Sequence, residues 1–481
     1  MLALAAFVLC QSCFILVPSA FCQDTPAGPG NLRAGAATSN ITPPIGGGIV
    51  GGFVPVPSTH IHDELHARCL VLDDGKTRLA LVVCDLLGIH RSVSDRAREL
   101  IFTKTGISKD CVLISATHTH SATSALGDRR YSFDSELNEY QQFVAERIAD
   151  GVVRAINQLE PAEVAFGSAS VPEHVFNRRW FMTEEKIPDT PFGTRDRVKM
   201  NPPAGSPDLI DPAGPTDPAV SFIALRRHNG QLISLYAAYS LHYVGGTGPG
   251  HISADYFGMF CQELIRLTDS SDADPPFVPM MANGTSGDIN NINFRTPRPG
   301  QPPYAQMKYV ANDVASKVHL ALEGIDWSGS TQLDASYREV DVRWRRPTPA
   351  QLEWAKSKLA EPASDTNKTD LPRIYAERTL AMAGQPETAP VPVQVLKIGN
   401  ARVGSLPCEV LVEIGLAFRK QSHSKPAFLV SMAHGYYGYL PTPEQHELGG
   451  YETWLGTNRL EIDSSVVLLN ALVQMSGDEQ R

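Results

Sequence analysis

The sequence contains no block of basic residues. Its 42 lysines and arginines are outnumbered by 52 aspartates and glutamates, which gives a formal net charge of −10 over 481 residues. Because proteins that bind nucleic acid carry a clustered positive surface, nucleic acid is excluded as a partner. Internal repeats are also lacking, and the 42% hydrophobic and 20% charged residues are ordinary for a globular protein.

Long apolar runs are absent beyond the N-terminus, so no later segment is predicted to span a bilayer. Residues 1–20 are largely apolar, and the small residues Ala20 and Cys22 stand at positions −3 and −1 before Gln23. This pattern predicts a signal peptide over residues 1–22, cleaved before Gln23, and hence a secreted or periplasmic protein. The positively charged start of a signal peptide is missing, which leaves an uncleaved anchor as the alternative.

Cysteine is scarce and follows no metal-binding spacing. Three of the eight cysteines belong to the predicted signal peptide, and the others mostly lie in apolar runs; these are Cys69, Cys84, Cys111, Cys261 and Cys408. We therefore predict buried free thiols rather than a disulfide framework or metal ligands.

Short apolar runs of strand length alternate with segments of helical periodicity along most of the chain. This alternation predicts an α/β fold, with mixed sheets flanked by helices, in which residues 23–481 form one large domain. Strands are expected at residues 35–44, 65–72, 79–84, 111–116, 220–225, 233–240, 393–398, 401–406 and 427–433, and helices at 92–105, 136–159, 255–267, 304–322 and 409–421.

Three segments depart from this alternation. The glycine-rich loop 45–53 lacks the Lys-Ser/Thr pair and the following helix of a phosphate-binding loop, so its glycines are assigned a conformational role. Residues 183–218, rich in Pro, Gly and Asp, are expected to form a long surface loop. Residues 349–390 are expected to form a helical insertion with a break around 363–367.

His118 and His120 form the most informative local motif. The apolar run 111–116 is followed at once by Thr-His-Thr-His-Ser. Side chains at i and i+2 of an extended segment project to the same side, so both imidazoles can face one pocket, and neutral imidazole is the commonest protein ligand of zinc. Taken alone, the motif more often marks two hydrogen-bonded loop histidines than a metal site.

Three residues elsewhere can bind metal but decide little individually. His242 ends a second apolar run, where open α/β sheets place functional groups. Glu409 is expected to begin a helix, where the helix dipole favours a carboxylate. Tyr439 stands in an aromatic run, where packing is the default role.

The order of these residues resembles that of the neutral/alkaline non-lysosomal ceramidase family. The resemblance is carried by Ile61-His62, Cys84-Asp85, Thr117-His118-Thr119-His120, Asn177-Arg178, His242 with Ser253 to Gly258, Pro407-Cys408-Glu409, and Tyr439 through Tyr451-Glu452. It implies that one zinc ion is bound by His118, His242, Glu409 and Tyr439. It also implies that His120, Arg178 and Tyr451 line the active site of an enzyme that cleaves the amide bond of ceramide by zinc-activated water.

The main departure from this resemblance lies at Asn290, where the family has a serine. A carboxamide cannot form an acyl-enzyme, so Asn290 is assigned the role of orienting water or donating to an oxyanion. Ser286 lies four residues too early to replace that serine. The resemblance covers only the N-terminal catalytic domain of the family.

The leading prediction is therefore an exported zinc-dependent amidohydrolase that acts on ceramide or a related N-acyl lipid. Its partners would be a small-molecule or lipid substrate and, by peripheral contact, a membrane surface. The alternatives are a catalytically idle homologue that binds a lipid or another ligand, and a metal-dependent esterase, deacetylase or phosphoesterase. The sequence makes no prediction about the oligomeric state.

Overall fold

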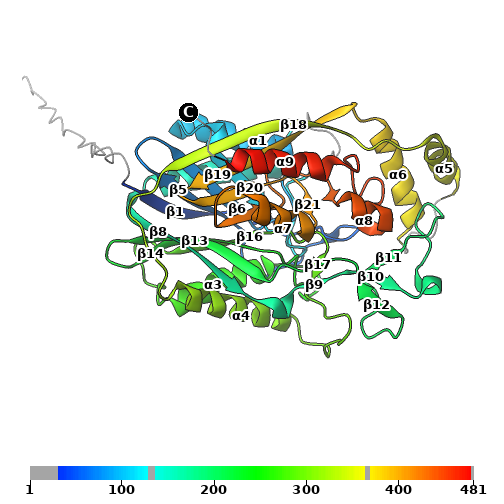
Figure 1. Ribbon diagram of the computed structural model, residues 1–481, viewed down its shortest axis with the longest axis horizontal. Helices are drawn as coiled ribbons and strands as arrows, with labels where there is room; N and C mark the ends of the chain where they lie inside the picture. Colours follow the sequence, from blue (N-terminus) through cyan, green and yellow to red (C-terminus); the bar gives the residue numbers. More distant parts are fainter. Residues whose placement is uncertain (1–30, 128–135, 363–368, 478–481) are drawn as a thin grey trace, which may run out of the picture.

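The protein is built around two packed β-sheets (Figure 1). The computed structural model describes residues 31–127, 136–362 and 369–477, so the predicted signal peptide and the predicted break at 363–367 lie outside the described residues. Among the described residues, no helix is long and apolar enough to cross a membrane.

The larger sheet contains eight strands in the order β16-β14-β13-β8-β1-β5-β6-β7. In that order, the strands are Val278–Asn283, Leu232–Tyr239, Ala219–Arg227, Glu160–Ser170, Arg33–Asn40, His66–Asp73, Arg78–Cys84 and Val112–Ala116. Neighbours are antiparallel except for the outermost pair at each edge, which is parallel. Most of these strands are buried on both faces, which explains their near-continuous apolar sequences.

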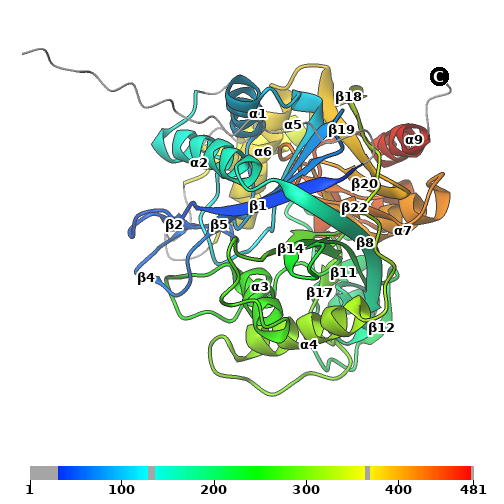
Figure 2. The same ribbon diagram turned by 90° about the vertical axis from the view of Figure 1, so that its left-hand side faces the viewer.

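One face of this sheet packs against a four-stranded sheet of β18 (Leu333–Arg343), β19 (Thr388–Ile398), β20 (Ala401–Ser405) and β22 (Ala427–Val430). The outer face of the larger sheet is covered by α1 (Arg91–Thr105), α2 (Glu139–Ile156), α3 (Asp255–Leu267) and α4 (Ala305–Leu322). The outer face of the smaller sheet is covered by α7 (Val412–Gln421) and α9 (Ser464–Ser476). The resulting helix–sheet–sheet–helix layering (Figure 2) confirms the predicted α/β class with mixed sheets flanked by helices.

The curvature of the larger sheet matters for function. Its edge strand β16 contacts β7 at the opposite edge, and the side-chain amide of Asn283 donates to the backbone oxygen of Thr117 over 2.9 Å. The segments that follow β7 and β14 are thereby brought to one place, although six positions separate these strands in the sheet order.

A smaller region beside the two sheets is formed by segments that the sequence marked as irregular. The predicted long surface loop at 183–218 contains two short strands, because β11 (Val198–Met200) and β12 (Leu209–Pro212) pair with β10 (Arg179–Met182). The predicted helical insertion contains α5 (Pro349–Ala360) and α6 (Leu371–Ala383). Both groups lie at the same end of the molecule (Figure 1).

The cysteine prediction is confirmed. Cys69, Cys84, Cys111, Cys261 and Cys408 are free thiols in the described structure, and all except Cys111 are buried. Burial raises the pKa of the Cys69 thiol to about 12, so this thiol stays protonated and unreactive at neutral pH.

Candidate metal centre and cavity

The predicted metal ligands come from four separate strand ends. His118 follows β7 and His242 follows β14, as expected from their sequence context. The expected helix start at Glu409 is wrong, because Glu409 lies on the short strand β21 (Glu409–Val410) and helix α7 begins three residues later. Strand β21 runs parallel to β23 (Tyr439–Leu440), and this pairing places Glu409 directly opposite Tyr439.

The donor atoms of His118, His242 and Glu409 lie close together. The Oε2 atom of Glu409 lies 3.2 Å from Nε2 of His118 and 3.7 Å from Nε2 of His242. The Nε2 atom of His120 lies 3.3 Å from that of His118. The ring centroids of His118 and His242 are 4.7 Å apart.

Hydrogen bonds on the far side of each ligand fix which atom faces the other donors. Nδ1 of His118 lies 2.6 Å from the carbonyl oxygen of Leu87, and Nδ1 of His242 lies 2.9 Å from that of Ser286. Because a carbonyl oxygen only accepts, we assign the ring proton to Nδ1, which leaves the Nε2 lone pair of each ring facing inward. The Tyr436 hydroxyl similarly donates to Oε1 of Glu409 over 2.8 Å and leaves Oε2 for the centre.

Two of the inward-facing atoms fit a bound cation. Nε2 of His242 and Oε2 of Glu409 are buried, and neither has a hydrogen-bond partner within the part of the chain that the structure describes. An unpaired buried polar atom is costly, and a divalent cation would satisfy both atoms at once. Two imidazoles and a carboxylate are typical zinc donors.

The electrostatics of the ligands agree with this fit. Burial opposes ionisation of Glu409, but the neighbouring His118 and His242 outweigh it and hold the pKa of that carboxyl well below its usual range. Burial, reinforced by neighbouring charges, holds the pKa values of His120 and His242 well below the ordinary histidine value. The carboxylate is therefore ionised and these imidazoles are neutral, as metal binding requires.

The geometry leaves two sets of residues that could hold a metal. The Nδ1 or Nε2 atoms of His118, His120 and His242 lie within 4.8 Å of one another, which makes a three-histidine group. The resemblance-based set replaces His120 with Glu409 and Tyr439. We favour the second set because Glu409 supplies an unpaired anionic oxygen between two histidines, whereas His120 stacks on Tyr243 with ring centroids 3.8 Å apart and faces a cavity.

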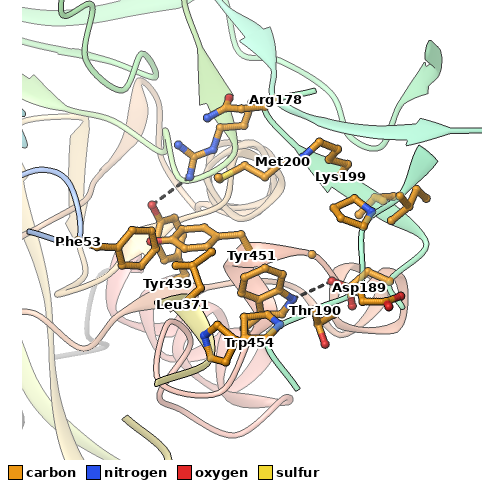
Figure 3. Close-up of a pocket in the computed structure, with 18 of the residues that line it drawn as sticks. Phe53, Arg178, Asp189, Thr190, Lys199, Met200, Leu371, Tyr439, Tyr451 and Trp454 are labelled. Atoms are coloured by element: carbon orange, nitrogen blue, oxygen red, sulfur yellow. Dashed lines mark hydrogen bonds between the residues drawn. The ribbon is translucent and has the colours of Figure 1, made fainter. Parts of the chain in front are cut away.

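That cavity opens directly in front of the centre and has a volume of about 490 Å³. Its inner end is formed by His120, Arg178, Tyr439 and Tyr451, all predicted site residues. Its outer walls come from the glycine-rich loop through Phe53, from residues 187–201, and from the start of α6 (Figure 3). Most of the lining is apolar or aromatic, which favours a ligand with a hydrophobic body and a polar group at the metal end.

Arg178 is held rigidly at the inner end of the cavity. Its Nη2 donates to the hydroxyl of Tyr439 over 3.0 Å, as Figure 3 shows, and its Nε donates to Glu452 over 3.0 Å. The second oxygen of Glu452 pairs with Arg179 at 2.7 Å. All three charged residues are almost completely buried, so this Arg–Glu–Arg group fixes the position of the guanidinium beside the metal centre.

Asn290 and Ser286 are not among the described residues that line the cavity. Asn290, on β17 (Ile289–Asn290), donates to the side chain of Asn201 over 3.1 Å, and it is Asn201 that lines the cavity. Ser286 donates to Asn283 over 2.7 Å on the Nδ1 side of His242, away from the metal face of the ring. The structure thus brings seven predicted site residues to the centre or the cavity. Asn290 does not line the cavity but contacts Asn201, which does.

Two residues with supporting roles were not identified as site residues from the sequence. Tyr436 orients Glu409, and Glu452 neutralises Arg178. Tyr436 lies three residues before Tyr439 and Glu452 is adjacent to Tyr451, so proximity to a candidate was the only available signal. The roles themselves depend on contacts between residues far apart in the chain.

Together, the four-layer fold and the buried His/Glu centre at the end of an apolar cavity define an α/β protein with a pocket whose side chains could bind a metal. The family profile described as neutral/alkaline non-lysosomal ceramidase, N-terminal, matches residues 33–298, which is more than half of the chain. The chain belongs to this family.

Individual relatives agree with this assignment. The neutral ceramidase of Pseudomonas aeruginosa is 22% identical over 456 residues, a match that spans 82% of this chain but only 64% of that protein. Two solved structures share the fold over 93% of this chain. The first is a ceramidase complexed with C2, with a TM-score of 0.68 and 19% sequence identity over 75% of that chain. The second is the neutral ceramidase of Pseudomonas aeruginosa, with a TM-score of 0.66 and 20% sequence identity over 74% of that chain.

Proposed function

We propose that the protein is a zinc-dependent amidohydrolase that cleaves the N-acyl bond of ceramide or a related lipid. The observation that carries this proposal is the pair of buried, unpartnered donor atoms on His242 and Glu409 at the inner end of a mostly apolar cavity. Family membership and the printed names of the relatives support the choice of an N-acyl lipid.

The ligands for one zinc ion would be His118, His242, Glu409 and Tyr439. Zinc bound there would polarise an amide carbonyl and lower the pKa of a water molecule. Tyr436 keeps Oε2 of Glu409 directed at the centre, and Arg178 keeps the Tyr439 oxygen there.

The remaining residues position the substrate and handle protons. His120 is neutral and lies 3.3 Å from His118 at the cavity end, where it can donate a proton to the departing amine after accepting one. The Arg178 guanidinium and the Tyr451 ring face the same space, so the positive charge of Arg178 stabilises an oxyanion that develops there. The apolar walls exclude water around the lipid chains.

Substrate turnover tests the proposal directly. Purified protein should contain about one zinc ion per chain and should hydrolyse N-acyl sphingoid amides, with chelation abolishing turnover. Matched esters and phosphoesters serve as comparison substrates, because a metal-dependent esterase or phosphoesterase would prefer these. Zinc-loaded protein that binds ceramide and turns over none of the panel would instead identify a ligand-binding homologue.

Substitution of Asn290 tests the role of this residue, which stands where the family has a serine. Because Asn290 acts through Asn201, we expect Asn290→Ala to lower kcat about 10²-fold, the lower end of the range for one lost polar contact in an active site, with KM little changed. Ser286→Ala is the matched control and should change kcat much less. Accumulation of an acyl-enzyme on Ser286, detected by mass spectrometry, would refute this assignment.

Export is a separate prediction from the sequence. We expect residues 1–22 to be removed, so N-terminal sequencing of the secreted or periplasmic protein should begin at Gln23. Recovery of an intact Met1 in the membrane fraction would support the uncleaved anchor.

A further inference from the structure

Residues 44–57 form a surface loop, the 44–57 loop, that carries a cluster of exposed aliphatic side chains. Ile45 is 58% exposed, Val54 is 63% exposed and Val56 is 53% exposed. Proline or glycine lies next to each of them in the sequence. Exposed aliphatic side chains that cluster on one short loop mark an interaction site more often than exposed aliphatic side chains that are scattered over the surface.

The charge distribution around this loop is also unusual. Residues 34–62 contain no Asp, Glu, Lys or Arg, although 20% of the whole chain is charged. The body of the protein carries a net charge of −10. An uncharged apolar loop on an acidic protein is suited to a lipid surface with electrically neutral headgroups over an apolar interior. It offers no charges that would attract an anionic or a cationic partner.

The loop forms one side of the cavity mouth. Gly51 and Phe53 line the cavity, and the ring of Phe53 meets that of Tyr451 edge-on with centroids 6.3 Å apart. Figure 3 shows Phe53 beside Tyr451. Gly51 approaches the catalytic region so closely that a Cβ atom there would lie 2.7 Å from Cβ of His120. Whatever covers the loop therefore lies next to the entrance.

Backbone hydrogen bonds hold the loop in this position. The amide of Val50 donates to the carbonyl oxygen of Ala122, two residues beyond His120, over 3.0 Å. Within the loop, strand β2 (Gly48–Ile49) pairs with β3 (Val56–Pro57). The loop stands out from the body of the protein beside β4 (Figure 2). Its aliphatic side chains are thus presented on a fixed support.

We propose that the 44–57 loop inserts its aliphatic side chains into the surface of a zwitterionic lipid bilayer, so that the cavity takes an N-acyl lipid directly from that surface. The delivery step rests on the proposed function, whereas the docking does not. A protein partner fits less well, because protein interfaces are rich in Tyr, Trp and Arg with a hydrogen-bonding rim, and the loop has none of these three residue types.

Vesicle binding tests the docking without reference to activity. Zinc-loaded protein should cosediment with phosphatidylcholine vesicles, and added salt should not release it. Val54→Asp should weaken this partitioning about tenfold, and Ile45→Asp should do so independently, since each removes the burial of one aliphatic side chain. Leu320→Asp is the matched control, because Leu320 on α4 is 62% exposed and lies away from the cavity lining.

A second measurement separates docking from catalysis. Turnover of a short-chain, monomerically soluble N-acyl amide should be unchanged in Val54→Asp and Ile45→Asp, while turnover of ceramide embedded in vesicles should fall in parallel with binding. If no amide is hydrolysed but both variants lose vesicle binding, the proposed function fails and the docking stands. If the unsubstituted protein does not bind phosphatidylcholine, binds only anionic vesicles, or forms a dimer that Val54→Asp dissociates, the docking proposal is overturned.

Discussion

His118→Ala should leave the protein without bound zinc and without hydrolytic activity. His118 is 4% exposed and presents Nε2 to Glu409, so its loss removes one of the assigned donors, while His120 at the same strand end stacks on Tyr243 and faces the cavity. Metal analysis after dialysis should fall from about one zinc per chain to background. Turnover should fall at least 10³-fold, as expected when both carbonyl polarisation and water activation are lost.

The matched control for this substitution is His174→Ala. His174 is as deeply buried as His118, but its Nε2 pairs with Asp313 at 2.8 Å, outside the metal centre. We expect this variant to keep its zinc and its activity while losing some stability. Zinc retained at full stoichiometry in His118→Ala would show that a set of ligands without His118 binds the ion, and both the assigned ligands and the three-histidine group would be wrong.

The strand and helix pattern was predictable wherever apolar periodicity is strong. The predicted helix at 255–267 matches α3, and the buried runs at 79–84 and 111–116 appear as β6 and β7. Two long strands were missed. Strand β8 is rich in Ala, Gly and Pro, and β18 carries exposed charges, so neither shows a clean pattern; β18 is stabilised by pairing with β19 along all eleven residues.

The candidate site was predictable only as a set of residues, not as a geometry. His118 and His242 were placed correctly at strand ends because a strand followed by a polar loop is visible in the sequence. Glu409 was misplaced on a helix because the local pattern at 409–421 is helical, and only its pairing with Tyr439 overrides that pattern. Asn290 was assigned by its match to a motif, and the motif could not reveal that Asn201 lies between it and the cavity.

Glu452→Ala should be the most destabilising substitution near the site. Glu452 has no exposed surface and is the shared partner of Arg178 and Arg179, at 3.0 and 2.7 Å. Removing it leaves two buried guanidinium groups without their counter-ion, and breaking a buried ion pair in this way costs about 3–5 kcal/mol. Denaturant titration should show the loss as a lower unfolding midpoint.

The contrast with a surface ion pair makes this prediction specific. Glu353 pairs with Lys356 at 2.8 Å, but their side chains are 75% and 61% exposed, so Glu353→Ala should change the free energy of unfolding by less than about 1 kcal/mol. Glu452→Gln keeps hydrogen-bond capacity without the charge and should fall between the two. Because Arg178 then loses its counter-ion and is held less firmly beside Tyr439, kcat should fall in Glu452→Gln even where the protein remains folded. Equal unfolding midpoints for Glu452→Ala and Glu353→Ala would mean that the Arg–Glu–Arg group is solvated in solution and cannot fix the guanidinium at the metal centre.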